Sequence, residues 1–419
     1  MSEQTLKKFV RRYAGLGGFG GVITGLLAPV MYVVLKEKGY DSLHIGMMVF
    51  VTALVTAIFN IPFGILADRY GRKRVFLLGE LFMFVFCIGL LLFDAFSVLL
   101  ALMAIAGLSA AMASGTLDAL FVDTIETYSR DPKAVQQSSA VAGGYQMGGV
   151  FAGAFISSVL AYFYMGALAS HRFEINYLVA ALLIPLHMLA VTIMIPSDAN
   201  VRRDKIGSVL FGRERGSILS TCMNNSVLSL LLLSSSISAL AFMSFEKFWK
   251  IKLSNLVNFE GGQWLFGAVY AGSKLVSMIG QLLSPRLCRA FGNNYNNVMI
   301  FVRIALAAAF STLYFLTDII SFVLAFLCIF LIAALSSSPV MTLFHNQVRE
   351  TERTAMLSLR AVFLQVGAMA GILIATYAAH TYSLEFAFLL SAIVFLLSTA
   401  LMLTPKTTAL GRRLAQGGV

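Results

Sequence analysis

Long apolar stretches recur along the whole chain, separated by short polar intervals. Val75–Phe93 and Tyr177–Ile195 are two of them, and each is almost free of charged residues. Such stretches are typical of helices that cross a membrane, since about 20 residues of helix span the hydrocarbon core. The pattern predicts twelve membrane-spanning helices, at residues 14–35, 44–66, 75–93, 96–118, 137–163, 177–195, 226–248, 261–283, 297–317, 319–343, 355–379 and 383–403. Pro29 predicts a kink in the first of them.

The longest polar interval, residues 196–225, falls between the sixth and the seventh predicted helix. It divides the chain into a first half, residues 1–195, and a second half, residues 226–419. We therefore expect an all-α membrane protein of twelve transmembrane helices in two six-helix halves joined by this linker. Secondary transporters are commonly built from such repeated halves, with the substrate site between them near the bilayer midplane.

Composition and charge agree with this interpretation. The 419 residues are 58% apolar and 12% charged, and Lys and Arg number 31 against 20 Asp and Glu. If the N-terminus is cytoplasmic, 23 of the 31 basic residues fall in or beside cytoplasmic segments. Because positive residues concentrate on the cytoplasmic side of membrane proteins, we expect both termini in the cytoplasm. The basic excess then reflects topology, and no nucleic-acid partner is indicated.

The sequence carries no sign of an enzyme. Its four cysteines are scattered and lack the spacing of a metal site or a disulfide framework. The phosphate-binding loop of ATP-driven proteins is absent, as is the HExxH pattern of zinc hydrolases. We expect no metal and no cofactor.

One motif stands out, GILADRYGRKR at Gly64–Arg74, between the second and third predicted helices. Gly64 suits close helix approach and Gly71 a tight turn, while Asp68 could cap a facing helix. A weaker, basic counterpart, SPRLCRAFGN at Ser284–Asn293, occupies the matching place in the second half. Together these features predict a cytoplasmic gate formed by Gly64, Asp68, Arg69, Gly71 and Arg72, with Asp123 and Glu126 as ion-pair partners.

This motif resembles the signature of the major facilitator superfamily, G-x-L-A-D-r-x-G-r-k, and the resemblance extends along the chain. Shorter matches, at Ser114–Ala119 and at Glu352–Ala355, resemble bacterial transporters of drugs and metabolites. The resemblance implies alternating access, a monomer and the bacterial inner membrane. Two departures weaken the antiporter signature. Met103 replaces the arginine that many antiporters carry in helix four, and helix five keeps its glycine packing surface at 148–153 but lacks the usual proline.

Ionisable residues inside the predicted helices are functional candidates, because charge is costly at the bilayer centre. Lys274 lies deepest and either faces the solute pathway, forms a structural ion pair or extends to the interface. Asp118 either takes part in proton coupling, with Lys274 as a candidate partner, or has a structural role at a helix end. Structural or interfacial roles are the better interpretation of three further charged residues near helix ends, Glu80, Arg303 and Arg360.

His187 lies in the middle of the sixth predicted helix, and its imidazole either titrates in function or is simply packed. Tyr145, Gln146 and Gln365 either line the cavity or bond between helices. The first function that we expect is proton-coupled efflux of a drug-like or secreted metabolite, with the solute, protons and lipid as partners. The alternative is import or uniport of a polar or anionic metabolite, which Lys274 and Met103 favour.

Overall fold

The computed structural model describes residues 3–114, 116–128, 132–163, 174–195, 225–257, 264–347 and 353–415. Within these ranges the regular structure is entirely α-helical, as the apolar pattern predicts. Eleven helical segments there are long and apolar enough to cross a membrane. The remaining long helix, α12 (Trp264–Ala290), has 27 residues and so measures about 40 Å, but Lys274, Arg286 and Arg289 make it more polar.

The chain divides into two compact units, Met1–Ile206 with Asn258–Ala271 and Gly207–Val257 with Gly272–Val419. The first unit contains α1 (Glu3–Leu27), α2 (Met31–Glu37), α3 (Ser42–Tyr70), α4 (Arg72–Leu92), α5 (Phe96–Ala113), α6 (Thr116–Tyr128), α7 (Pro132–Phe163) and α8 (Glu174–Met194). The second contains α11 (Ser226–Leu256), most of α12, α13 (Tyr295–Thr312), α14 (Ile319–Leu335), α15 (Ser337–His345), α16 (Arg353–Thr381), α17 (Leu384–Met402) and α18 (Pro405–Ala415).

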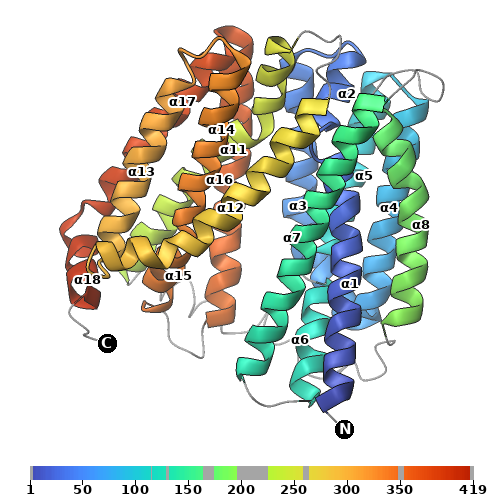
Figure 1. Ribbon diagram of the computed structural model, residues 1–419, viewed down its shortest axis with the longest axis horizontal. Helices are drawn as coiled ribbons and strands as arrows, with labels where there is room; N and C mark the ends of the chain where they lie inside the picture. Colours follow the sequence, from blue (N-terminus) through green and yellow to red (C-terminus); the bar gives the residue numbers. More distant parts are fainter. Residues whose placement is uncertain are drawn as a thin grey trace. The chain divides into compact units, whose positions relative to one another are not determined.

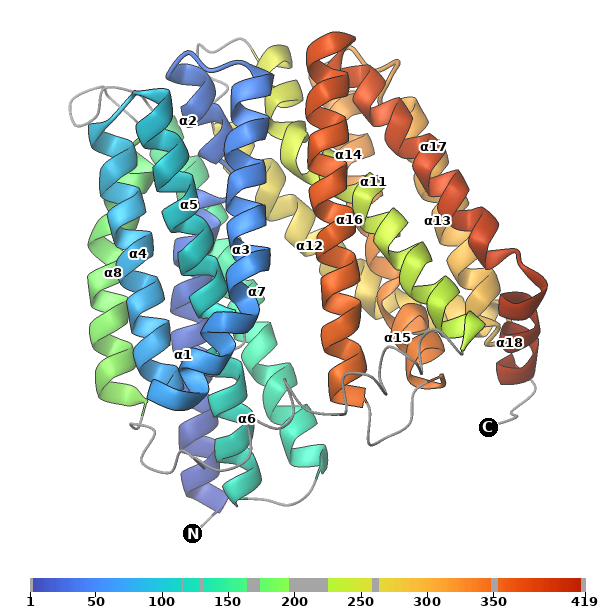
Figure 2. The ribbon, with the colours of Figure 1, turned by 180° about the vertical axis from the view of Figure 1, so that it is seen from behind.

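Helix neighbours follow the same order in both units (Figures 1 and 2). In the first unit α1 packs along α7, α3 along α5, and α4 along α8. In the second unit α11 packs along α16, and α13 along α17. Helices one and five, and three and six, of the first half therefore pair as helices seven and eleven, and nine and twelve, pair in the second.

Backbone-to-backbone packing joins α1 to α7. A Cβ atom added at Gly149 would collide with the carbonyl oxygen of Gly18, and one added at Gly153 would collide with that of Val22. Of the glycines expected to form a packing surface on helix five, Gly149 and Gly153 therefore do so, whereas a Cβ atom at Gly148 would meet no atom within 4 Å. The same arrangement recurs in the second unit, where Gly367 and Gly371 of α16 lie against backbone carbonyls of α11.

Three predicted helices are interrupted. The first is broken between Leu27 and Met31, around Pro29, which confirms the kink expected there. The predicted segments 96–118 and 319–343 are each confirmed as one membrane-spanning segment, Phe96–Asp118 and Ile319–Phe344, but the helix is interrupted within each. α5 ends at Ala113 and α6 starts at Thr116, while α15 follows a bend at Ser336. Pro339 lies in the first turn of α15, where a residue without a backbone N–H is tolerated.

Candidate functional site

The predicted gate loop is a sharp turn between α3 and α4. Gly71 has φ +104° and ψ 128°, which side-chain-bearing residues rarely adopt, and its N–H donates to the Ala67 carbonyl over 2.9 Å. The glycine at this position is therefore required by backbone geometry. Lys73, two residues on, donates to the carbonyls of Thr192 and Ile195 over 2.8 and 2.6 Å, so it closes the C-terminal end of α8.

For the other predicted gate residues the structure gives fewer contacts. Arg69 is exposed and Arg72 is half-buried, and the side chains of Asp68, Asp123 and Glu126 lie outside the described residues. A Cβ atom at Gly64 would meet no atom within 4 Å. Within the described part of its own unit, Gly64 therefore makes no close helix approach.

Asp118, on α6, accepts a hydrogen bond of 2.6 Å from the hydroxyl of Tyr13 on α1. The Tyr13 ring is buried and stacks on Phe121, with 4.0 Å between ring centroids. This contact links two helices whose residues lie 105 positions apart. Sequence reasoning missed Tyr13 as the partner of Asp118, because no motif connects the two residues.

His187 is a buried polar residue that contacts two neighbouring helices of the first unit. Its ring is 3% exposed; Nε2 lies 3.2 Å from the carbonyl oxygen of Leu16 on α1, and Nδ1 lies 3.1 Å from Oε2 of Glu80 on α4. Gly20 leaves space beside the ring, since a Cβ there would lie 3.4 Å from it. The structure thus brings together His187, a predicted functional candidate, and Glu80, which was expected to be structural.

Lys274, on α12, lies within the second unit. Its ammonium is 5.9 Å from the centroid of the Phe330 ring on α14, at the distance of a cation–π contact. Asp118, the expected partner of Lys274, belongs to the first unit. The surroundings of Asp118 and of Lys274 are therefore described separately. Of the uncharged candidates, Tyr145 is 54% exposed, Gln146 is exposed, and Gln365 is half-buried on α16.

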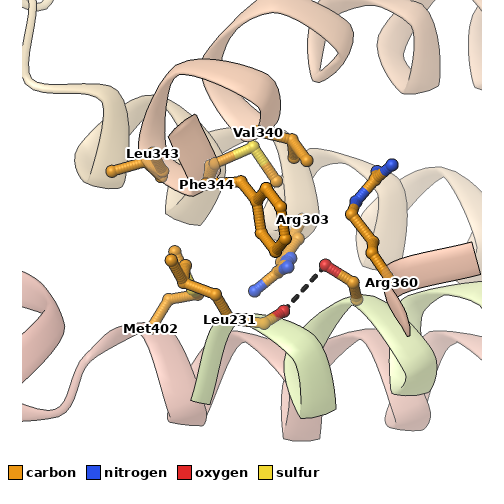
Figure 3. A pocket seen from close by; sticks show the side chains of 9 residues that line it. Leu231, Arg303, Val340, Leu343, Phe344, Arg360 and Met402 are labelled. Atoms are coloured by element: carbon orange, nitrogen blue, oxygen red, sulfur yellow. Dashed lines mark hydrogen bonds between the residues drawn. The ribbon is translucent and has the colours of Figure 1, made fainter. Parts of the chain in front are cut away.

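A small cavity in the second unit is bordered by two arginines (Figure 3). Arg303, on α13, is 3% exposed and donates through Nη1 to the carbonyl of Ser398 over 3.0 Å. Arg360, on α16, is half-buried. Arg303 therefore makes a buried contact with α17, which agrees with the structural role expected for it and not with the interfacial one. The other lining residues are Leu231, Ser235, Met299, Val340, Leu343, Phe344 and Met402.

An ion-pair cluster closes the end of the first unit away from the N-terminus. The ammonium of Lys38, just after α2, lies 2.5 Å from Asp94 Oδ1 and 2.9 Å from Glu174 Oε1 at the start of α8. Burial alone would lower the pKa of Lys38, but the hydrogen bonds to Asp94 and Glu174 outweigh it and raise the pKa above the usual 10.5. No pattern in the sequence indicates this cluster, since its members lie far apart along the chain.

The chain also resembles known proteins. The family model described as Major Facilitator Superfamily matches residues 14–352. The Quinolone resistance protein NorA of Staphylococcus aureus is 30% identical over 157 residues, which are 34% of this chain and 38% of NorA. An uncharacterized MFS-type transporter of Bacillus subtilis, YxaM, is 42% identical over 53 residues, 13% of each chain. These matches thus span well under half the length of either relative.

Solved structures share the fold at low sequence identity. A point mutant of the nucleoside transporter NupG superimposes with a TM-score of 0.78 at 11% identity, covering 94% of this chain and 100% of that one. A bacterial homologue of the human lysosomal transporter Spinster gives a TM-score of 0.73 at 12% identity, covering 99% of both chains. With its helical architecture and its loop motif, this multi-pass membrane chain belongs to the major facilitator superfamily of transporters.

Proposed function

We propose that this protein is a secondary transporter that exports a small drug-like or secreted metabolite in exchange for protons, by alternating access. The observation that carries the proposal is the loop between α3 and α4. It keeps the superfamily motif, the obligatory glycine geometry at Gly71 and a lysine that joins α4 to the end of α8. This loop suits a gate whose two helices move together.

The outward direction rests on the similarity to NorA, whose name describes quinolone resistance. Import or uniport of a polar or anionic metabolite is the second candidate. Lys274 favours import because an ammonium group in a solute pathway would attract an acidic solute. Met103 favours it for a different reason: this buried methionine, 1% exposed, replaces the arginine that many antiporters carry in helix four. The structural resemblance to NupG concerns the fold and does not discriminate between the two directions.

Vesicles of known orientation separate the two directions. Purified protein would be reconstituted in liposomes, the orientation determined by protease access to a C-terminal tag, and a fluorescent quinolone used as the probe. We expect uptake into inside-out vesicles when their lumen is acidic, and its loss when a protonophore collapses the gradient. Accumulation only in right-side-out vesicles, or uptake that ignores the proton gradient, would contradict proton-coupled export.

We further propose that the protein is a monomer of the bacterial inner membrane with both termini and residues 196–225 in the cytoplasm. The distribution of 23 of the 31 basic residues supports this orientation. Reporter fusions at residue 210 and after residue 419 should be active only with a cytoplasmic reporter. A periplasmic signal from residue 210 would reverse the topology.

A further inference from the structure

The hydrogen-bond contacts of His187 indicate how many protons the His187 ring and the Glu80 carboxyl group hold together. A carbonyl oxygen only accepts hydrogen bonds, so the contact between Nε2 and the Leu16 carbonyl requires a proton on Nε2. In a neutral ring Nδ1 then carries a lone pair, and it points at Oε2 of Glu80 over 3.1 Å. An ionised carboxylate also only accepts, so the two lone pairs would repel each other.

One additional proton removes this conflict. It lies either on Nδ1, which gives an imidazolium paired with a carboxylate, or on Glu80, which gives a carboxylic acid that donates to a neutral ring. In both cases the pair carries no net charge, whereas without the additional proton its net charge is −1. Since net charge is costly inside a membrane, the buried arrangement seen here fits the protonated pair.

The pair sits at a depth suited to a membrane-embedded proton site. Glu80 is eight residues beyond the start of α4 at Arg72, which places it about 12 Å along the helix. His187 comes from α8, and the accepting carbonyl comes from α1. The two contacts of the His187 ring therefore connect α8 to both α1 and α4. A movement of α1 relative to α8 would remove the acceptor of Nε2 and with it the reason for the protonation of both ring nitrogens.

Among the side chains that the structure describes, the other titratable groups near the pair, Cys87 apart, have partners of their own or are exposed. On α4, Cys87 lies two turns beyond Glu80 and interacts with it electrostatically. On α1, Tyr13 lies one turn before Leu16, and its hydroxyl is bonded to Asp118 of α6. α5 has no charged residue, and the titratable side chain described on the facing length of α7, Tyr145, is exposed. Glu80 is the charged partner that the structure records for His187.

We propose that Glu80 and His187 together bind one exchangeable proton, and that this is the proton that the transporter couples to its solute. The inference rests on the proposed proton coupling and adds the site. Binding transfers one proton from water to the Glu80–His187 pair, and no other bond of the pair is broken. Release returns that proton to water and leaves a neutral imidazole beside a carboxylate. The released state needs hydration, so opening the pair to one side of the membrane favours release there.

Proton binding can be measured without any solute. His44, His171, His345 and His380 would be replaced by Gln, so that the ¹⁵N signals of the ring come from His187 alone. In lipid nanodiscs we expect a single pH transition of these signals. Its midpoint should fall by at least about one pH unit, a roughly tenfold loss of proton affinity, in Glu80→Gln. Equal midpoints with and without Glu80 would show that the two groups do not share a proton and would overturn the inference.

The coupling role needs a second measurement. Liposomes would report quinolone accumulation under an imposed proton gradient, and quinolone exchange without a gradient. We expect Glu80→Gln and His187→Gln to retain exchange while losing at least about tenfold in gradient-driven accumulation. His380→Gln, at the exposed end of α16, is the matched control and should behave as the wild type.

The outcomes separate the inference from the function on which it rests. If the wild type and both variants are driven equally by the gradient, the protein is proton-coupled but the coupling site lies elsewhere. If the wild type itself ignores the gradient, the proposed coupling falls, and the role of the pair in coupling falls with it. If exchange is also abolished in the variants while the ¹⁵N midpoints are equal, the pair is a structural contact between α1, α4 and α8.

Discussion

Several polar residues inside this protein are engaged by a neighbouring helix. Asp118 accepts from Tyr13, His187 contacts both α1 and α4, and Arg303 donates to α17. A polar group without such a partner would be costly within the bilayer, because hydrocarbon offers no hydrogen bonds. Each of these side chains thus joins two helices.

Gly71 provides the simplest test at the scale of a residue. Gly71→Ala should lower the free energy of unfolding by on the order of 1 to 3 kcal/mol, because its φ of +104° strains any residue with a Cβ. Thermal unfolding in detergent measures this as a lower Tm. Gly17→Ala is the control, since Gly17 lies within α1 and a Cβ there would meet no atom within 4 Å. Equal Tm values for the two variants would contradict the turn geometry.

The bond between Tyr13 and Asp118 gives a second residue-scale prediction. Tyr13→Phe keeps the ring on Phe121 but removes the donor, so the free energy of unfolding should fall by about 1 kcal/mol. Asp118→Asn should act through the same bond, and the double variant should therefore be less destabilised than the sum of the single variants. Tyr145→Phe, at an exposed tyrosine, should change stability little. Strict additivity of Tyr13→Phe and Asp118→Asn would show that the bond contributes nothing.

At the scale of the element, two adjacent glycines of α7 differ in whether they pack against α1. A Cβ at Gly149 would collide with the backbone of α1, whereas one at the adjacent Gly148 would meet no atom within 4 Å. Gly149→Ala should therefore destabilise the protein by about 1 to 3 kcal/mol, as expected of overpacking. Gly148→Ala should be neutral or slightly stabilising, because alanine favours helix. Thermal unfolding of the two variants decides, and equal stabilities would exclude a tight α1–α7 contact.

Hydropathy predicted the helices well because the bilayer imposes a minimum apolar length on each. It did not predict the breaks at Ser114 and Ser336, since both surroundings remain apolar and the interruption depends on local backbone geometry. Nor could it predict which polar residues meet. Glu80 and His187 lie 107 positions apart, and their contact depends on how α4 and α8 are rotated about their axes. Apolar helices such as these carry little periodicity from which that rotation could be read.

At the scale of the whole molecule, the two units repeat the same polar contacts. Lys38 pairs with Glu174 between the ends of the first and sixth helices of the first half, and Lys252 pairs with Glu385 over 2.5 Å at the matching place in the second. Hydroxyl bonds recur likewise, from Thr56 to the Gly107 carbonyl and from Ser284 to that of Leu335, each across 51 positions. The internal repeat is thus far clearer in these contacts than in the sequence.

The ion pairs at the end of the first unit should respond to alkaline pH. The pKa of Lys38 is raised by folding, so the stability it contributes is complete below its unfolded pKa, near 10.5, and is lost as pH rises through the higher folded value. Lys38→Met should therefore unfold more easily than the wild type at about pH 7 to 10, and the difference should shrink above pH 10.5. Chemical unfolding across this range measures it. A difference that stays constant to about pH 12 would show that the charge of Lys38 contributes nothing.

The repeat also places an acidic side chain in the first unit at a position where the second unit has a guanidinium. Glu80 is the ninth residue of α4 and Arg303 the ninth of α13, and each bonds to the last membrane-spanning helix of its own half, Glu80 to His187 and Arg303 to the Ser398 carbonyl. A guanidinium stays protonated at accessible pH, so the contact of Arg303 is fixed whereas that of Glu80 can titrate. Arg303→Gln should therefore lower Tm without moving the pH midpoint of transport, and Glu80→Gln should move the midpoint. A shifted midpoint in Arg303→Gln would assign proton coupling to both units.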